Sequence, residues 1–576
     1  MRALGELEVL VLDCQATGAS PAFGHVLEMG WTVVRGGEAG EGEPSIEAHW
    51  IALPEGHVVP GPVRKLTGWR PAVAAGAIPD RQAWERLLAA IGPSRPAPTA
   101  IHYARFELAF LREWAARLGA GAAFPLDPVC VYAIANRLYP DLPRLSLRAL
   151  AGYLGHGLAL ERRAPGHVEA TAFVWRRMRD ELAARGVATW EALQAWLAES
   201  AAPRRPRQSK PRYPIDSQRF RSLPDQPGVY RFLRRNGDVL YVGKAASLKK
   251  RTASHFVGRA SKLLVPEMLT QVSDIVVTVA ASPLEAALLE NETIKALNPP
   301  YNVQLRSGDP RVWYSDAAFA SAAAAPDARH RIGPLSSEHA LRPLGALVEL
   351  LAGGAATLSV RAHAVGMSAL WPPDEAVFAA GWQGLLARHH EAVAAVVAGT
   401  EDPRGQALQL ARALLAAGAG ERDADEMEEA TEPGAARTWD PERVTRHLER
   451  AAAQAYRAYR RSRWLRLVHD CEVAYREPGA AAARTLLVRG GQITGATEAR
   501  DEEDPWRELA PAPEQPDTIA AAVAVADPFD RARYDRLRIL TSELKRILRD
   551  GGDACVTTRS GRRLPAERLR AISAVI

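Results

Sequence analysis

Residues 228–244 read GVYRFLRRNGDVLYVGK, and this stretch predicts a β-hairpin. Two runs rich in β-branched and aromatic residues flank Asn236-Gly237, a dipeptide that favours a two-residue type I′ hairpin turn because both positions tolerate a positive φ. Such a turn places Tyr230 opposite Gly243, which has no side chain and leaves room for the ring. Because side chains alternate along a strand, Tyr241 is expected on the same face as Tyr230, as its diagonal neighbour.

The chain after this hairpin predicts a short helix, a strand and a longer helix. Ser247 is a suitable N-cap for a helix whose first turn, 248–251 (LKKR), carries three cations. A further strand is expected over 274–280. The segment 282–285 (SPLE) is a capping box with proline at the first helical position, so the second helix should begin at residue 283.

Glu290 is the unusual residue of that second helix. Its neighbours one turn away on either side are apolar, and a carboxylate on an apolar stripe is costly unless it is paired or holds a metal. A hydrogen-bonded or snorkelling glutamate and a metal ligand are both compatible with this pattern.

Four blocks along residues 227–303 resemble the GIY-YIG nuclease domain, most closely its version in UvrC and in the shorter UvrC homologue Cho. The blocks are PGVYRF, LYVGKAASLKKR, EAALLENETIK and NPPYNV. They occur in the order and at the separations of that family. The resemblance implies a small α/β domain over residues 216–310 that hydrolyses DNA phosphodiester bonds with one divalent metal, Mg²⁺ or Mn²⁺.

The resemblance also implies roles for individual residues. Glu290 would hold the metal, and the hydroxyls of Tyr230 and Tyr241 would lie near the attacking water and the scissile phosphate. Arg251 would stabilise the charge of the phosphoryl transition state, and Lys244 would assist at the nucleophile or the phosphate. The residues expected to bind DNA or to orient the site are Lys249, Lys250, His255 and Asn302. At His255 the UvrC pattern usually has tyrosine, although a histidine can also form hydrogen bonds or bind phosphate.

Residues 1–180 have the order of strands and helices of an α/β domain. Strands are expected over 8–13, 26–35 and 99–101, and helices over 81–91, 105–118 and most of 130–180. The blocks VLDCQATGASP, IHYARFELAFL, RLSLRALAGYLG and RRAPGHVEATA resemble the DnaQ-like, DEDDh-type 3′–5′ exonucleases. This second resemblance implies an RNase H-like fold.

That exonuclease family holds two metals with four carboxylates and uses a histidine as base. The matching positions here are Asp13, Gln15, Glu107, Arg162 in place of the histidine, and His167 in place of the last aspartate. Gln15 is neutral and Arg162 cannot accept a proton at neutral pH, so both the metal site and the base are weakened. We therefore predict a degenerate, catalytically silent site. The alternative is a remodelled, active exonuclease in which His167 acts as ligand or base beside Asp13 and Glu107.

Length and composition limit the remaining possibilities. The 576 residues predict several domains, and the net charge of +6 permits a nucleic-acid partner without demanding one. The cysteines, Cys14, Cys130, Cys471 and Cys555, form no CxxC pair, so neither a zinc site nor a disulfide framework is indicated. The sequence shows no signal peptide and no apolar run long enough for a bilayer. We therefore expect a cytoplasmic protein without a membrane partner.

The rest of the chain is less specific. Residues 181–215 should comprise a helix and a basic Pro/Arg tether that follows the DNA backbone or simply solubilises the chain. Residues 311–576 predict an α+β region, in which 331–352 resemble the segment after the GIY-YIG domain of UvrC. Helices are expected over 384–417, 440–466 and 529–549, and a hairpin across Gly490-Gly491.

Together these features predict a multidomain α/β nuclease that incises DNA. Damaged duplex is the expected substrate, nucleotide excision repair or a related pathway is the expected setting, and a UvrB-like loading protein is a candidate partner. Two other classes stay open: an active 3′–5′ exonuclease with an auxiliary GIY-YIG domain, and a non-catalytic DNA-binding repair adaptor. A scaffold has no need of Tyr230, Tyr241, Arg251 and Glu290 together, which argues against the adaptor.

Overall fold

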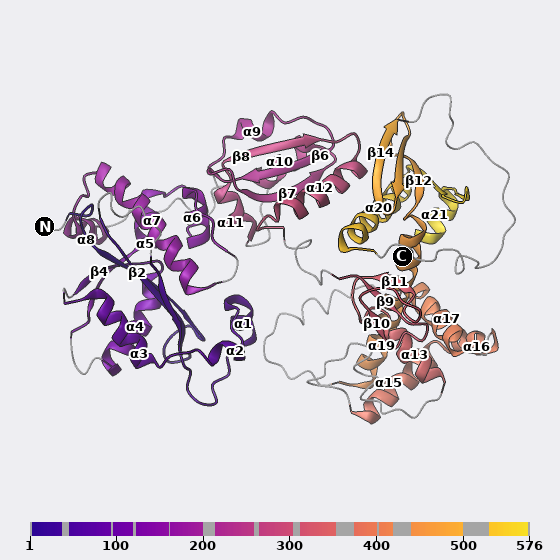
Figure 1. Ribbon diagram of the computed structural model, residues 1–576, viewed down its shortest axis with the longest axis horizontal. Coiled ribbons are helices and arrows are strands. Elements are labelled where there is room, and N and C mark those ends of the chain that lie inside the picture. The colour runs from indigo at the N-terminus through magenta and orange to yellow at the C-terminus, as the bar shows by residue number, and fades with distance from the viewer. Residues whose placement is uncertain are drawn as a thin grey trace. The chain divides into compact units, whose positions relative to one another are not determined.

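The computed structural model describes residues 3–36, 45–93, 96–118, 123–159, 162–199, 213–257, 264–302, 311–352, 374–399, 402–418, 439–498 and 529–573. Contacts divide the chain into two compact units, residues 1–281 with 292–306 and residues 282–291 with 307–576, whose elements are labelled in Figure 1. Within the described ranges, no helix combines the length and apolar character needed to cross a membrane. The basic tether expected over 202–212 lies outside these ranges.

The first unit begins with a mixed five-stranded sheet whose strand order is β3-β2-β1-β4-β5. Its strands are β1 (Val9–Ala16), β2 (Val26–Val34), β3 (Glu47–Trp50), β4 (Ala97–Ile101) and β5 (Leu126–Cys130). β1 pairs antiparallel with β2 and parallel with β4, and β5 extends the parallel half. This is the RNase H-like arrangement that the sequence predicts.

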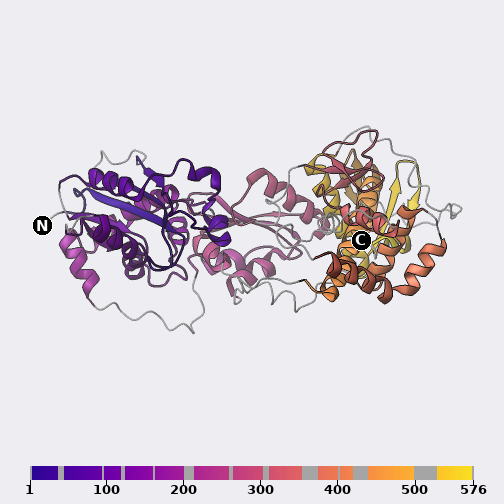
Figure 2. The ribbon, with the colours of Figure 1, turned by 90° about the horizontal axis from the view of Figure 1, so that it is seen from below.

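Helices cover both faces of this sheet (Figures 1 and 2). The alternation of β1 explains why, since Val9 and Val11 are buried in one core cluster with α5–α8, and Leu10 and Leu12 in another with α3 and α4. The helices are α1 (Gly61–Thr67), α2 (Pro71–Ala74), α3 (Asp80–Ile91), α4 (Ala104–Leu118), α5 (Val131–Leu138), α6 (Leu147–Leu154), α7 (Ala164–Ala184) and α8 (Trp190–Ala198). Because Trp190 is buried in the first cluster, this core continues beyond residue 180.

The second domain of the first unit is built on an antiparallel sheet with strand order β7-β6-β8. Its elements are α9 (Ser217–Arg221), β6 (Gly228–Leu233), β7 (Val239–Ala245), α10 (Leu248–Val257), α11 (Leu264–Gln271) and β8 (Asp274–Val279), and α12 (Pro283–Leu297) follows them in the chain. The expected caps are present, because the Ser247 and Ser282 hydroxyls accept from the backbone N–H groups of Lys250 (3.2 Å) and Glu285 (3.1 Å). The part of α12 up to Asn291 belongs to the second unit.

The turn between β6 and β7 differs from the predicted two-residue type I′ turn. Arg234 N–H donates to the Asp238 carbonyl (2.9 Å) and Gly237 N–H donates to the Arg234 carbonyl (3.0 Å), which closes a loop over 235–237. Gly237 has a positive φ of 89°, whereas Asn236 does not have a positive φ. Asn236 instead uses its side-chain oxygen to accept from Asp238 N–H (3.1 Å). This is the longer hairpin loop with glycine in the left-handed position.

A bulge then corrects the register of the two strands. Leu233 pairs with Val239, while Tyr230 pairs with Gly243, so Leu240 is the extra residue on β7. The predicted pairing of Tyr230 with Gly243 is therefore confirmed, although the predicted turn is wrong.

The second unit contains two hydrophobic clusters that share α19 (Pro441–Leu467). Val444 lies in the cluster of the small sheet β10-β9-β11, and Trp464 in the cluster of the antiparallel sheet β14-β13-β12-β15-β16. The other elements are β9 (Trp313–Ser315), β10 (Ala322–Ala323), β11 (Ile332–Leu335), α13 (Arg342–Leu351), α15 (Glu375–Arg388), α16 (His390–Gly399), α17 (Pro403–Ala416), β12 (Cys471–Arg476), β13 (Arg484–Arg489), β14 (Gln492–Glu498), α20 (Arg531–Arg549), β15 (Asp553–Thr558), β16 (Arg563–Leu564) and α21 (Ala566–Ser573). The predicted α+β character of this region is confirmed.

Candidate active site

Two tyrosines share one face of the β6–β7 hairpin. Tyr230 is fully buried on the central strand, and its ring centroid lies 6.0 Å from that of Tyr241. A Cβ atom at Gly243 would lie 2.5 Å from both Cζ and the hydroxyl oxygen of Tyr230. Glycine is therefore required at this position by the close approach of the ring.

His255 on α10 contacts the buried tyrosine. Its Nε2 atom lies 2.8 Å from the Tyr230 hydroxyl oxygen. Burial, together with the positive charge of Arg251, lowers the pKa of His255 from 6.5 to about 4. The imidazole is consequently neutral at neutral pH, with one ring nitrogen able to accept a hydrogen bond from the tyrosine.

Four exposed cations follow the tyrosines along β7 and the first turn of α10: Lys244, Lys249, Lys250 and Arg251. Lys250 Nζ lies 3.6 Å from an Asp225 carboxylate oxygen in a solvent-exposed pair. The first turn of α10 contains no acidic residue, so its cations oppose the positive end of the helix dipole. A bound phosphate would relieve this repulsion, since anions are stabilised at helix N-termini.

Asn302 holds the outer edge of β7. Its side chain accepts from Val242 N–H (2.8 Å) and donates to the Val242 carbonyl (2.7 Å). β7 lies at the edge of its sheet, where outward backbone groups need a partner from outside the sheet. Asn302 therefore fixes the residue that directly follows Tyr241.

Glu290 lies on α12, in the part of the helix that belongs to the second unit. This part is anchored there, because Leu284 and Leu288 are buried and Glu285 forms a 2.6 Å ion pair with Arg484. The Glu290 residue itself is half-buried. Mg²⁺ in nucleases and polymerases keeps several waters and takes one or two carboxylates together with substrate phosphates. A single partly accessible glutamate fits that set of donors.

The N-terminal domain gathers four of the five predicted exonuclease positions around the end of β1. Gln15 Nε2 donates to Asp13 Oδ2 (2.7 Å), and His167 Nδ1 lies 3.1 Å from Asp13 Oδ1. Glu107 is buried beside Asp13, and burial, followed by the negative charge of Asp13, raises the pKa of Glu107 well above its usual value. Arg162, the fifth position, is exposed on the segment before α7.

This cluster does not fit a two-metal site. Both oxygens of Asp13 are already engaged by Gln15 and His167, and the raised pKa of Glu107 disfavours the negative charge that a hard cation needs. Across the described ranges, no group of three or more His, Cys, Asp or Glu side chains is arranged to hold a metal ion. Where the exonuclease family places metals, this domain has a closed hydrogen-bonded cluster.

His102 also belongs to this neighbourhood, although no motif in the sequence singles it out. Burial lowers the pKa of His102 to about 4, and the charges of Asp13 and His167 act on it. It directly follows Ile101, which pairs with Leu12 on the neighbouring parallel strand. The position of His102 at the end of a strand that neighbours β1 places it beside Asp13.

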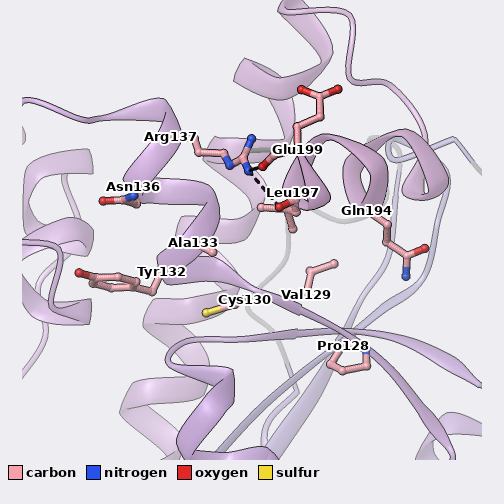
Figure 3. A pocket seen from close by; sticks show the side chains of 10 residues that line it. All are labelled: Pro128, Val129, Cys130, Tyr132, Ala133, Asn136, Arg137, Gln194, Leu197 and Glu199. Atoms are coloured by element: carbon pink, nitrogen blue, oxygen red, sulfur yellow. Dashed lines mark hydrogen bonds between the residues drawn. The ribbon is translucent and has the colours of Figure 1, made fainter. Parts of the chain in front are cut away.

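A pocket of about 600 Å³ lies elsewhere in the N-terminal domain, between β5, α5 and α8 (Figure 3). Its lining residues are Pro128, Val129, Cys130, Tyr132, Ala133, Asn136, Arg137, Gln194, Leu197 and Glu199. Arg137 is its cation, but the guanidinium donates to the backbone carbonyls of Leu197 (2.9 Å) and Glu199. Because Arg137 already holds the end of α8, this pocket does not present a phosphate site.

Comparison with known proteins identifies the domain that carries the tyrosines. The family model of the UvrC-like GIY-YIG domain matches residues 226–303. UvrABC system protein C of Alkalilimnicola ehrlichii is 50% identical over 101 residues, which cover 17% of this chain. Residues 226–303 form a UvrC-like GIY-YIG domain. The chain spans only 16% of the length of that relative, so the resemblance concerns this domain and not the whole protein.

Two solved structures resemble parts of this chain. The magnesium-bound GIY-YIG N-terminal endonuclease domain of UvrC from Thermotoga maritima is 31% identical and covers 15% of this chain and 93% of its own, with a TM-score of 0.14. Exonuclease X in complex with 5′ overhanging duplex DNA is 15% identical and covers 32% of this chain and 98% of its own, with a TM-score of 0.24. The second is a likeness of fold to the N-terminal region.

Proposed function

We propose that the GIY-YIG domain hydrolyses DNA phosphodiester bonds internally and makes a single incision. The observation that carries the proposal is the contact of Tyr230 with a neutral His255, on the face of the hairpin that also presents Tyr241. A buried tyrosine hydroxyl with a neutral acceptor behind it is suited to proton transfer. Exposed cations on β7 and α10 supply the charge that a phosphate substrate requires.

The proposed chemistry begins with a water molecule beside the Tyr230 hydroxyl. As the water attacks phosphorus, the P–O bond to the leaving strand breaks. The proton of the water passes to the Tyr230 oxygen while the tyrosine proton moves to His255 Nε2, and the leaving oxygen takes a proton from solvent. Arg251 and Lys244 stabilise the charge that gathers on the phosphoryl oxygens. Glu290 would hold Mg²⁺ or Mn²⁺, which supplies Lewis-acid stabilisation of the leaving oxygen when bound. Lys249 and Lys250 would contact the backbone of the DNA.

The proposed setting is repair of damaged duplex DNA, by nucleotide excision or a related pathway, with a UvrB-like protein as loading partner. The 50% sequence identity over 101 residues with UvrABC system protein C of Alkalilimnicola ehrlichii supports this repair setting. The cluster around Asp13 favours a non-hydrolytic role for the N-terminal domain, because its hydrogen bonds and the raised pKa of Glu107 disfavour metal binding.

The test is nicking of a duplex that carries a bubble or a bulky lesion, in Mg²⁺, by wild type and by Tyr230→Phe. Loss of general acid–base catalysis typically costs about 10²- to 10⁴-fold in rate, and we expect a decrease in that range. Arg219→Gln is the matched control, because Arg219 is an exposed cation of the same domain that pairs with Asp274. This variant should cut at the wild-type rate. Undiminished nicking by Tyr230→Phe would refute the proposed role of the hydroxyl.

A further inference from the structure

The N-terminal domain and the GIY-YIG domain meet at a polar contact between α6 and α11. Glu267 on α11 accepts from the Ser146 hydroxyl (2.9 Å) and from Arg148 Nη1 (3.1 Å). The Arg148 and Glu267 side chains are 12% and 17% exposed. In such a shielded pair, removing one partner leaves the other charge poorly solvated, so the contact resists separation of the two domains.

The same interface is also fitted by shape. Gln271 on α11 reaches α6 at Gly152, where a Cβ atom would lie only 1.9 Å from Gln271 Oε1. Gln271 is 2% exposed and accepts from Arg234 Nε (3.1 Å) at the end of β6. Arg234 is buried as well. The interface is consequently a packed, hydrogen-bonded surface and not a loose contact between two tethered modules.

Glu267 and Gln271 also hold Tyr301. The Tyr301 hydroxyl donates to Glu267 Oε1 (3.0 Å) and accepts from Gln271 Nε2 (2.7 Å). Burial, reinforced by the charge of Glu267, raises the pKa of Tyr301, so the hydroxyl keeps its proton. The next residue along the chain is Asn302, whose side-chain amide forms two hydrogen bonds with the backbone of Val242 on β7.

We propose that the N-terminal domain positions the incision site through Arg148. Its ion pair with Glu267 fixes Tyr301, and with it the Asn302 contact that holds β7 and Tyr241 in place. This inference rests on the proposed function of the GIY-YIG domain. It gives the N-terminal domain a role that needs no metal: the domain is a rigid support for the neighbouring site.

The first test measures single-turnover nicking by the full-length Arg148→Ala variant. A displacement of about 1 Å in a catalytic group can cost about 100-fold, and we expect a rate 10- to 100-fold below wild type with KM changed by less than about twofold. Arg148→Lys, which keeps a donor for Glu267, should recover part of the rate. Arg137→Ala is the matched control, because Arg137 ties α5 to the end of α8 inside the same domain and should leave the rate unchanged.

The second test does not depend on activity. Val242 N–H lies at the edge of the sheet and bonds to Asn302, so its hydrogen exchange reports directly on that contact. We expect this exchange to rise about tenfold in Arg148→Ala and in Gly152→Leu, which wedges α6 away from Gln271, and to stay unchanged in Arg137→Ala.

The outcomes separate the two proposals. If wild type nicks and Arg148→Ala nicks equally fast with unchanged exchange at Val242, the positioning role is overturned and the proposed function stands. If wild type does not nick, the proposed function fails, and the positioning of a catalytic site fails with it. The exchange of Val242 in Arg148→Ala then still decides whether the N-terminal domain holds β7.

Discussion

Gly243→Ala should disturb the site without removing any functional group. The new Cβ would lie 2.5 Å from Cζ and the hydroxyl oxygen of Tyr230 and 2.8 Å from Cε1 of Tyr241. Carbon atoms pack favourably at about 3.5–4.0 Å, so the Tyr230 ring must retreat by about 1 Å. It cannot retreat freely, because it is fully buried with its centroid 5.1 Å from the Phe232 ring and its hydroxyl on His255.

Two consequences follow from that collision. Overpacking of a filled site costs about 1–3 kcal/mol, so urea unfolding of this domain should shift by that amount. A shift of about 1 Å in a catalytic hydroxyl should lower the nicking rate by up to about 100-fold. Gly495→Ala is the matched control, a strand glycine with open space around its Cβ position. Wild-type nicking and stability in Gly243→Ala would contradict the packing that brings the two tyrosines together.

Three further substitutions test His255, the Asp13 cluster and the contact of Asn302 with β7. The pKa of His255 is about 4 in the folded chain and about 6.5 in the unfolded chain, so between these pH values the unfolded chain binds a proton that the folded chain does not. The free energy of unfolding should therefore fall by roughly 3 kcal/mol as pH drops from about 6.5 to about 4. His255→Gln should remove this pH dependence in urea titrations. Glu107 has a raised pKa, so its contribution to stability is full below about pH 4.5 and declines as pH rises. Glu107→Gln should therefore be more stable than wild type at neutral pH in urea titrations. A difference in stability between the two proteins that is the same at pH 4 and at pH 8 would contradict the raised pKa of Glu107. Asn302→Ala leaves the Val242 backbone groups without their partner, which should speed hydrogen exchange of the Val242 amide and lower the nicking rate by about tenfold. Exchange at the wild-type rate would show that Asn302 does not hold β7 in place.

The pairing of Tyr230 with Gly243 could be predicted from the sequence because strand alternation and a short turn leave few registers. The turn itself was mispredicted, because the Asn236 side chain bonds to the Asp238 backbone and thereby stabilises a longer loop. The bulge at Leu240 absorbs the difference. The two tyrosines still share one face, because the extra residue in the loop is offset by the extra residue at the bulge in β7.

The contacts that tune the site depend on tertiary structure and could not be read from local patterns. The neutral state of His255 follows from its burial against the sheet, and a helix in sequence gives no measure of that. The sequence predicts a degenerate exonuclease site from Gln15 and Arg162, whereas the hydrogen bonds of Gln15 and His167 to Asp13 are seen only in the structure. The contact of Arg148 with Glu267 joins residues more than a hundred positions apart, and no periodicity in the sequence predicts it.

The most direct measurement compares wild type, Glu290→Ala and Asp13→Ala on a duplex with a central bubble, labelled at each end in turn, with Mg²⁺ or Mn²⁺ present. We expect internal nicks for wild type and Asp13→Ala, no nicks for Glu290→Ala, and loss of all nicking in EDTA. Products that shorten one nucleotide at a time from a 3′ end, and that Asp13→Ala abolishes while Glu290→Ala does not, would contradict the account and make the N-terminal domain the active nuclease.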